Sequence, residues 1–224
     1  MVGCGEAQID LGEDARFWPC DEALARWRRP DGAVVSPGVF VPIAEELGLI
    51  HLLGKSVMRD ACFAAAGWNA KGIVSSVAVN ISPHQFDDPD FVNSVYQALD
   101  DSGLPPNLLE LEITESVIMQ KDYALTLLEE ISECGVELAI DDFGTGYSCL
   151  AYLKDLPAKK LKLDRAFILG LPEDRKSFAI VRTVTQLARD LGMTVVAEGV
   201  EYMSGMSRCA EERRGGWQYE PVLR

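Results

Sequence analysis

Two adjacent carboxylates, Asp141 and Asp142, end a short apolar run and precede a loop with two glycines. Residues 137–140 are typical of a buried strand, so the two acids fall at its carboxyl end, where parallel α/β folds place their chemistry. Carboxylate oxygens are the ligands that hard divalent cations prefer. An Asx-rich turn with glycines for backbone freedom has the same local pattern. On this stretch alone, a metal site and a plain turn are equally supported.

Four more apolar runs end in a charged or amide side chain. With the aspartates, the side chains at these ends are Asn80, Glu112, Asp141 with Asp142, Lys162 with Asp164, and Glu198. The successive separations of 32, 29, 21 and 36 residues are each roughly one βα repeat. In a closed barrel such spacing would gather all five ends on one rim.

The elements that must position these side chains alternate between strand and helix patterns. Short apolar runs predict strands at 74–81, 108–113, 137–141, 161–163 and 194–197. Helical spacing predicts helices that begin at Ser36-Pro37 and cover 54–68, 89–99, 122–134 and 175–191. This alternation predicts βαβ units and a parallel sheet, in a single domain over residues 1–224.

The composition excludes several classes of protein. The formal charge of −14 argues against nonspecific DNA or RNA binding, which needs a cationic surface. An acidic protein that handles a phosphate ester would instead need cations to mediate the contact. No apolar run approaches membrane-spanning length, so no membrane span is expected in this chain. The apolar content of 48% is sufficient for a core.

The six cysteines are scattered, with no close pair that would suggest a disulfide framework or a zinc knuckle. A reducing, cytoplasmic location fits this pattern best. His51 and His84 are the only histidines. Neither follows a predicted strand, so a mechanism based on histidine or zinc is not expected.

Seven motifs occur in the order in which they occur in the EAL domain, and the sequence therefore resembles that family from about Glu22 to Glu201. They are Glu22-Ala23-Leu24 with Arg26-Trp27, Phe40-Val41-Pro42-Ile43-Ala44-Glu45, Val79-Asn80-Ile81-Ser82, Glu112-Ile113-Thr114-Glu115, Asp141-Asp142-Phe143-Gly144-Thr145-Gly146-Tyr147-Ser148, Leu161-Lys162-Leu163-Asp164 and Ala197-Glu198-Gly199-Val200-Glu201. Any one of them alone could be accidental; a chance match of all seven is far less plausible.

The resemblance implies a modified TIM-type (β/α)8 barrel with one antiparallel strand. It also implies two divalent cations, Mg²⁺ or Mn²⁺, and hydrolysis of cyclic di-GMP to linear pGpG. By similarity, the first cation would be held by Glu22, Asn80, Glu112 and Asp141, and the second by Asp141, Asp142 and Glu198. A carboxylate shared by two cations suits in-line attack on a phosphodiester. Glu22, Lys162 and Glu198 would be the catalytic residues, with Lys162 positioning or deprotonating the attacking water.

Other family positions are matched around this set. Similarity assigns substrate contacts to Leu24, Arg26, Asp164 and Gln218. It assigns support of the glycine-containing loop to Glu115 and Glu201, and that loop comprises Phe143, Gly144, Thr145, Gly146, Tyr147 and Ser148. In relatives this loop takes part in a homodimer interface. Phe40 is expected in core or rim packing, or flanking a guanine.

Both ends of the chain depart from the family pattern. Residues 1–21 and 202–224 show no recognisable family strand, and Pro19 and Asp21 stand where a buried strand would have apolar residues. We therefore expect a barrel that is incomplete at both ends, with reduced hydrolysis. The alternative is a catalytically impaired module that binds cyclic di-GMP or acts as an interaction domain. A sensory or cyclase domain could be attached in a longer protein.

Overall fold

The protein is represented by a computed structural model in which residues 2–7, 20–73, 75–120, 123–144, 153–168, 174–197 and 218–219 are described. An eight-stranded sheet has the order β1-β2-β5-β6-β7-β8-β9-β10. Its strands are β1 (Val2–Ala7), β2 (Cys20–Ala25), β5 (Ser76–Ile81), β6 (Leu109–Thr114), β7 (Glu137–Phe143), β8 (Lys160–Leu163), β9 (Thr194–Ala197) and β10 (Gln218–Tyr219). A separate antiparallel hairpin is formed by β3 (Trp27–Arg28) and β4 (Val34–Val35).

The strand pairing is that of the modified barrel. β1 pairs antiparallel with β2, and all other neighbouring strands of the large sheet are parallel. The sheet thus has eight strands, one of them antiparallel, as the resemblance implied. Within the described residues no pairing joins β1 to β10.

Both ends of the chain contribute strands, although the sequence shows no recognisable family strand in residues 1–21 or 202–224. Cys20–Ala25 forms β2 despite Asp21, and Cys20 and Ala23 are both buried. At the other end, Gln218 pairs with Val196 of β9, so β10 occupies the position of the strand that the sequence did not reveal. Backbone pairing with a neighbouring strand therefore outweighs the unfavourable local composition at both places.

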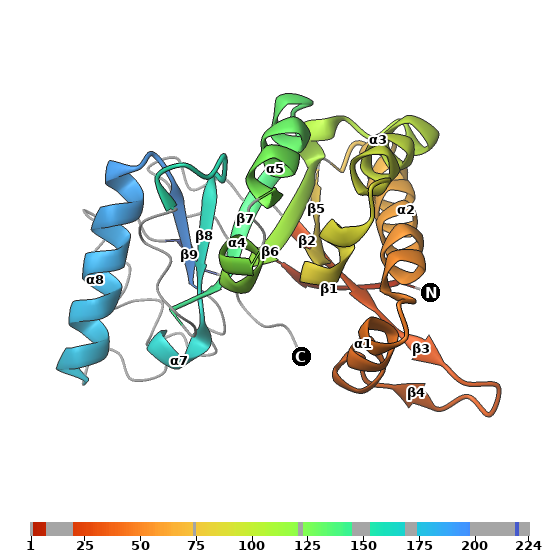
Figure 1. Cartoon of the computed structure of the whole chain (residues 1–224), viewed down its shortest axis with the longest axis horizontal. Coiled ribbons are helices and arrows are strands. Elements are labelled where there is room, and N and C mark those ends of the chain that lie inside the picture. The colour runs from red at the N-terminus through yellow and green to blue at the C-terminus, as the bar shows by residue number, and fades with distance from the viewer. Residues whose placement is uncertain are drawn as a thin grey trace.

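Helices connect the strands, and several pack beside them (Figure 1). The helices are α1 (Pro37–Glu46), α2 (Ile50–Asn69), α3 (Phe91–Ser102), α4 (Glu115–Gln120), α5 (Ala124–Glu133), α7 (Arg165–Ile168) and α8 (Arg175–Asp190), with short 3₁₀ turns at Pro83–Asp87 and Pro106–Leu108. α2 contacts β5, α5 contacts β7 and α8 contacts β9. None of the helices in the described part of the chain has the length and apolarity that a bilayer crossing needs.

The central strands have two chemically different faces, because successive side chains point to opposite sides of a sheet. Leu109, Leu111 and Ile113 of β6 belong to the hydrophobic core that the helices cover. Glu110 and Glu112 alternate with them and are buried as well. We call this polar side the inner face of the sheet, and it carries the candidate site.

Leu128 of α5 tests the contribution of the core. Its side chain is 1% exposed, so Leu128→Ala is expected to lower the free energy of unfolding by about 2–5 kcal/mol, through lost burial and the cavity that remains. Leu52→Ala is the matched control: Leu52 is 68% exposed, and a change within about 0.5 kcal/mol is expected. Urea-induced unfolding measures both, and equal losses would contradict this assignment of the core.

Candidate active site

The first pair of site residues joins β2 to β5. Parallel pairing sets Glu22 beside Ala78, and Asn80 lies two residues further along β5, on the same face. The Asn80 side-chain amide donates a hydrogen bond from Nδ2 to Glu22 Oε1 at 2.5 Å. Two predicted ligands that are 58 residues apart in sequence are therefore in direct contact.

Lys162 of β8 stands at the centre of the second group. Its side chain is 2% exposed, and its Nζ donates a hydrogen bond to Glu112 Oε1 at 2.7 Å. The same Nζ lies 3.7 Å from Asp141 Oδ1. Parallel register explains the meeting. Ile140 pairs with Leu161, so the next residues along β7 and β8 are Asp141 and Lys162, and Thr114 of β6 pairs with Asp141. The carboxyl ends of β5 to β8 are thus brought together, as predicted.

Burial and repulsion between carboxylates raise the pKa of two acidic side chains in this group. Burial raises the pKa of Glu112 well above its ordinary value, Asp141 and Glu22 raise it further, and the Lys162 ammonium opposes the shift. The pKa of Asp142 is also raised, by partial burial and by the carboxylates of Asp141 and Asp164. The site is therefore rich in negative charge that a single lysine only partly offsets.

The oxygen atoms of this group are of the type that the implied divalent cations bind. Glu112 Oε2 is buried and has no hydrogen-bond partner among the described residues. A buried carboxylate oxygen without a partner is costly, and a hard cation would satisfy it. In that same part of the chain, no three His, Cys, Asp or Glu side chains are arranged to hold an ion as they stand; Glu22 and Glu112 each accept a hydrogen bond, from Asn80 and Lys162. The chemistry of the donors fits such ions.

The carboxyl end of β7 and the residue that follows it have an uncommon backbone conformation. Asp142 has a φ of 53°, in the left-handed region that Asp tolerates better than most residues, and Gly144 has a φ of 96°. The Asp142 N–H donates a hydrogen bond to Asp141 Oδ1 at 2.9 Å, and the Gly144 N–H donates one to Glu115 Oε1 at 2.9 Å. Glu115 is buried, so it anchors the start of the glycine-containing loop from α4.

Gly144→Ala is expected to lower the free energy of unfolding by about 1–3 kcal/mol. A side chain at this φ is strained, and its Cβ would lie 2.8 Å from two ring carbons of Phe167. Gly67→Ala is the control within helix α2: its Cβ meets nothing within 4 Å, so stabilisation by about 0.5–1 kcal/mol is expected. Urea-induced unfolding should give opposite signs for the two variants; the same sign would contradict this account.

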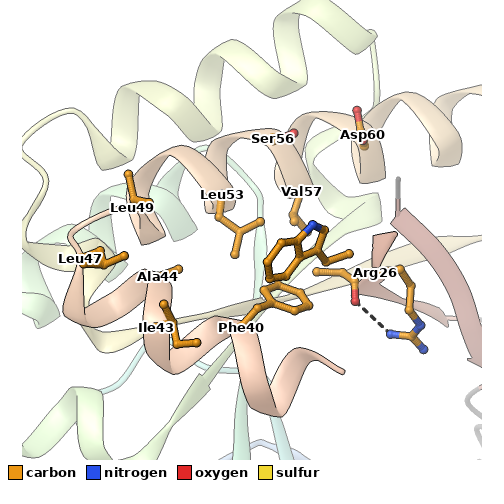
Figure 2. A pocket seen from close by; sticks show the side chains of 12 residues that line it. Arg26, Phe40, Ile43, Ala44, Leu47, Leu49, Leu53, Ser56, Val57 and Asp60 are labelled. Carbon is orange, nitrogen blue, oxygen red and sulfur yellow. Dashed lines mark hydrogen bonds between the residues drawn. The ribbon is translucent and has the colours of Figure 1, made fainter. Parts of the chain in front are cut away.

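The predicted substrate contacts come from β2 and β10 and from the residues that directly follow β2 and β8. Asp164 follows β8, and its Oδ1 accepts a hydrogen bond from the Ala166 N–H at 2.7 Å. Leu24 is partly buried on β2, and the backbone of Gln218 is in β10. Arg26 is exposed and lines a cavity of about 440 Å³ with Phe40, Val57 and other side chains of α1 and α2 (Figure 2).

Several predicted residues lie outside the described part of the chain and stay predictions. They are Glu198, Glu201, Thr145, Gly146, Tyr147 and Ser148. Phe143 and Gly144 are described, and the Phe143 side chain is buried.

Lys160 was not among the residues that the sequence predicted for the site. Lys160 forms an ion pair with Glu110, which is 1% exposed, and lies 3.8 Å from Glu137. This pair stands two residues below Lys162 and Glu112 on the same strands, so it fills the inner face beneath the site. The alternation in Lys160-Leu161-Lys162-Leu163 was the available signal, because it places both lysines on one face.

Comparison with known proteins agrees with this geometry. The family model "EAL domain" matches residues 21–211. The chain is 46% identical over 182 residues to the bifunctional diguanylate cyclase/cyclic di-GMP phosphodiesterase MucR of Pseudomonas aeruginosa, which covers 80% of the chain and 27% of MucR. It is 42% identical over 182 residues to the cyclic di-GMP phosphodiesterase NbdA of the same organism, covering 80% of the chain and 23% of NbdA. The chain thus spans about a quarter of the length of these relatives.

Solved structures share the fold. A structure of the PaMucR phosphodiesterase in complex with c-di-GMP has a TM-score of 0.88 at 39% identity, covering 99% of this chain and 90% of that one. The EAL domain of Mycobacterium smegmatis DcpA has a TM-score of 0.76 at 33% identity, covering 98% and 90% of the two chains. By its sequence, its TIM-like α/β fold and the order of its motifs, the chain belongs to the EAL domain family.

Proposed function

We propose that the chain hydrolyses cyclic di-GMP to linear pGpG, with two divalent cations, Mg²⁺ or Mn²⁺, as cofactors. The observation that carries this proposal is the buried Lys162 ammonium between Glu112 and Asp141, beside the Glu22–Asn80 pair. This set brings together hard oxygen donors and one cationic side chain from β2, β5, β6, β7 and β8. The relatives named as cyclic di-GMP phosphodiesterases support the choice of substrate.

Glu22, Asn80, Glu112 and Asp141 would hold one cation, and Asp141, Asp142 and Glu198 the other. When bound, such ions acidify water and neutralise charge on a phosphodiester. Lys162 Nζ lies between two carboxylates, and its role is to donate a hydrogen bond to the attacking water or to the phosphoryl oxygens as charge develops there. Glu115 fixes the backbone of the turn that carries Asp141 and Asp142.

Arg26 is exposed, and its Nη1 donates a hydrogen bond to the Ala25 carbonyl oxygen at 3.1 Å. Its guanidinium would contact a substrate phosphate as a forked donor. Leu24, Asp164 and Gln218 would complete the substrate contacts. A cytoplasmic setting, a homodimer formed through the loop of residues 143–148 and an attached sensory or cyclase domain belong to the same proposal.

The test is incubation of the purified chain with cyclic di-GMP, with and without Mn²⁺ or Mg²⁺, while substrate binding and pGpG formation are both followed. We expect metal-dependent pGpG formation that a chelator abolishes. Binding without turnover would instead support the module that only binds cyclic di-GMP. Absence of both would refute a role in handling this nucleotide.

A further inference from the structure

A hydrogen bond ties helix α1 to the strand that carries Asn80. Ser82 follows β5 and stands two residues after Asn80. Its Oγ donates a hydrogen bond to Glu45 Oε1 on α1 at 2.6 Å, in a partly buried setting. The bond joins residues 37 positions apart, so it is a tertiary link. Nothing in the chemistry described above assigns a role to Glu45.

The segment after β5 is fixed on its other side as well. The Ser82 N–H donates a hydrogen bond to Gln85 Oε1 at 3.1 Å, and the His84 N–H donates one to Ser82 Oγ at 3.2 Å. Gln85 is buried against helix α2 at Gly54, where an added Cβ would overlap its side-chain amide. Ser82 is therefore held by both helices, and its hydroxyl is used as donor and as acceptor.

The hydrogen bonds of Ser82 lie close in sequence to the Glu22–Asn80 contact. Only Ile81 separates Ser82 from Asn80, and Ile81 is buried and paired with Ile113 of β6. The Asn80 side chain is exposed to solvent, so packing against neighbouring side chains does not restrict it to one rotamer. A displacement of Ser82 would be transmitted through two peptide units to Asn80, and it would alter the 2.5 Å contact with Glu22.

We propose that Glu45 is a positioning residue: by holding Ser82, its carboxylate sets the Asn80 amide oxygen and the Glu22 carboxylate for a divalent cation. This inference rests on the proposed function, because it assumes that Asn80 and Glu22 bind such an ion. Groups that hold a metal ligand in place commonly alter metal affinity 10- to 100-fold when removed.

The experiment measures Mn²⁺ binding to the purified full chain by electron paramagnetic resonance of free Mn²⁺, with no substrate present. Glu45→Ala and Ser82→Ala are each expected to raise the dissociation constant of the tighter Mn²⁺ site about 10-fold. The double variant is expected to match the single variants, because both remove the same bond. Glu45→Gln should bind Mn²⁺ like the wild type, since its amide oxygen still accepts from Ser82.

Glu46→Ala is the matched control for the loss of one negative charge. Glu46 is the neighbouring residue of α1, is exposed, and should leave Mn²⁺ binding unchanged. Thermal unfolding of every variant separates metal affinity from stability.

Three outcomes would overturn the inference: wild-type Mn²⁺ affinity in Ser82→Ala, tenfold effects that multiply in the double variant, or loss of affinity in Glu45→Gln equal to that in Glu45→Ala. Ser82→Ala removes only a hydroxyl, so its Mn²⁺ affinity tests the inference even if Glu45→Ala does not fold. If the wild type binds no Mn²⁺, the metal dependence in the proposed function is wrong. If the wild type binds Mn²⁺ and the variants bind it equally, only the role of Glu45 is wrong.

Discussion

Replacement of Lys162 by alanine is expected to lower kcat for cyclic di-GMP about 10²- to 10⁴-fold, the range for removal of a positioned proton donor or acceptor. Lys162 Nζ lies 2.7 Å from Glu112 Oε1 and 3.7 Å from Asp141 Oδ1, and alanine provides no cationic donor at this buried position. Initial rates of pGpG formation at saturating substrate and Mn²⁺ measure the effect. A kcat within threefold of the wild type would contradict the role given to Lys162.

The same substitution should destabilise the metal-free protein. It removes one partner of a buried ion pair and leaves the Glu112 carboxylate uncompensated, for which about 3–5 kcal/mol is a typical loss. Mn²⁺ should restore part of this loss, because it would supply positive charge to the same carboxylates. Lys159→Ala is the matched control: the Lys159 side chain is 63% exposed and its Nζ lies 3.4 Å from Glu137 Oε1, so both kcat and stability should stay close to wild type.

Glu112→Gln is expected to lower kcat/KM at a fixed Mn²⁺ concentration by at least about 100-fold. Loss of a group that merely supports a metal ligand costs 10- to 100-fold in affinity or activity, and Glu112 is proposed as a ligand itself. Glutamine preserves the size of the side chain, so the change removes charge with little change in packing. Titration of the rate with Mn²⁺ should show a raised activation constant; an unchanged one would exclude Glu112 as a ligand.

The same variant should change how stability depends on pH without metal. Because the pKa of Glu112 is raised in the folded protein, that state binds more protons than the unfolded chain above the ordinary glutamate range. The contribution of Glu112 to the free energy of unfolding therefore falls as pH rises through this interval. Urea unfolding between about pH 5 and 8 should show a more negative slope for wild type than for Glu112→Gln. Equal slopes would contradict the shift.

Many helices and strands could be predicted from the sequence, because the spacing of apolar residues and the residues that cap a helix are local features of the chain. The predicted strand at 194–197 coincides with β9, and Ser36-Pro37 opens α1 as expected. β2 was missed because Pro19 and Asp21 obscure an apolar run, whereas the strand forms by pairing with β5. The β3–β4 hairpin, with two residues in each strand, is too short for a period to be visible.

The sequence predicted that four candidate side chains would lie near one another, but it did not predict their contacts. Strand ends that share one edge of a parallel sheet had to meet, which placed Asn80, Glu112, Asp141 and Lys162 together. The bond from Ser82 to Glu45 depends on where α1 packs, and no pattern within either segment encodes it.

The Lys160–Glu110 pair lies beneath the site on the inner face of the sheet. Beside this pair lies the buried Cys20, whose thiol pKa is raised by burial and by the Glu110 carboxylate. These side chains come from β2, β6 and β8 and occupy the inner face below Glu112. Buried side chains thus fill the layer directly below Glu112, and we expect a substrate to approach from the carboxyl ends of the strands. If the chain hydrolyses cyclic di-GMP as proposed, its linear product would leave from the same side, and we expect pGpG to compete with the cyclic substrate.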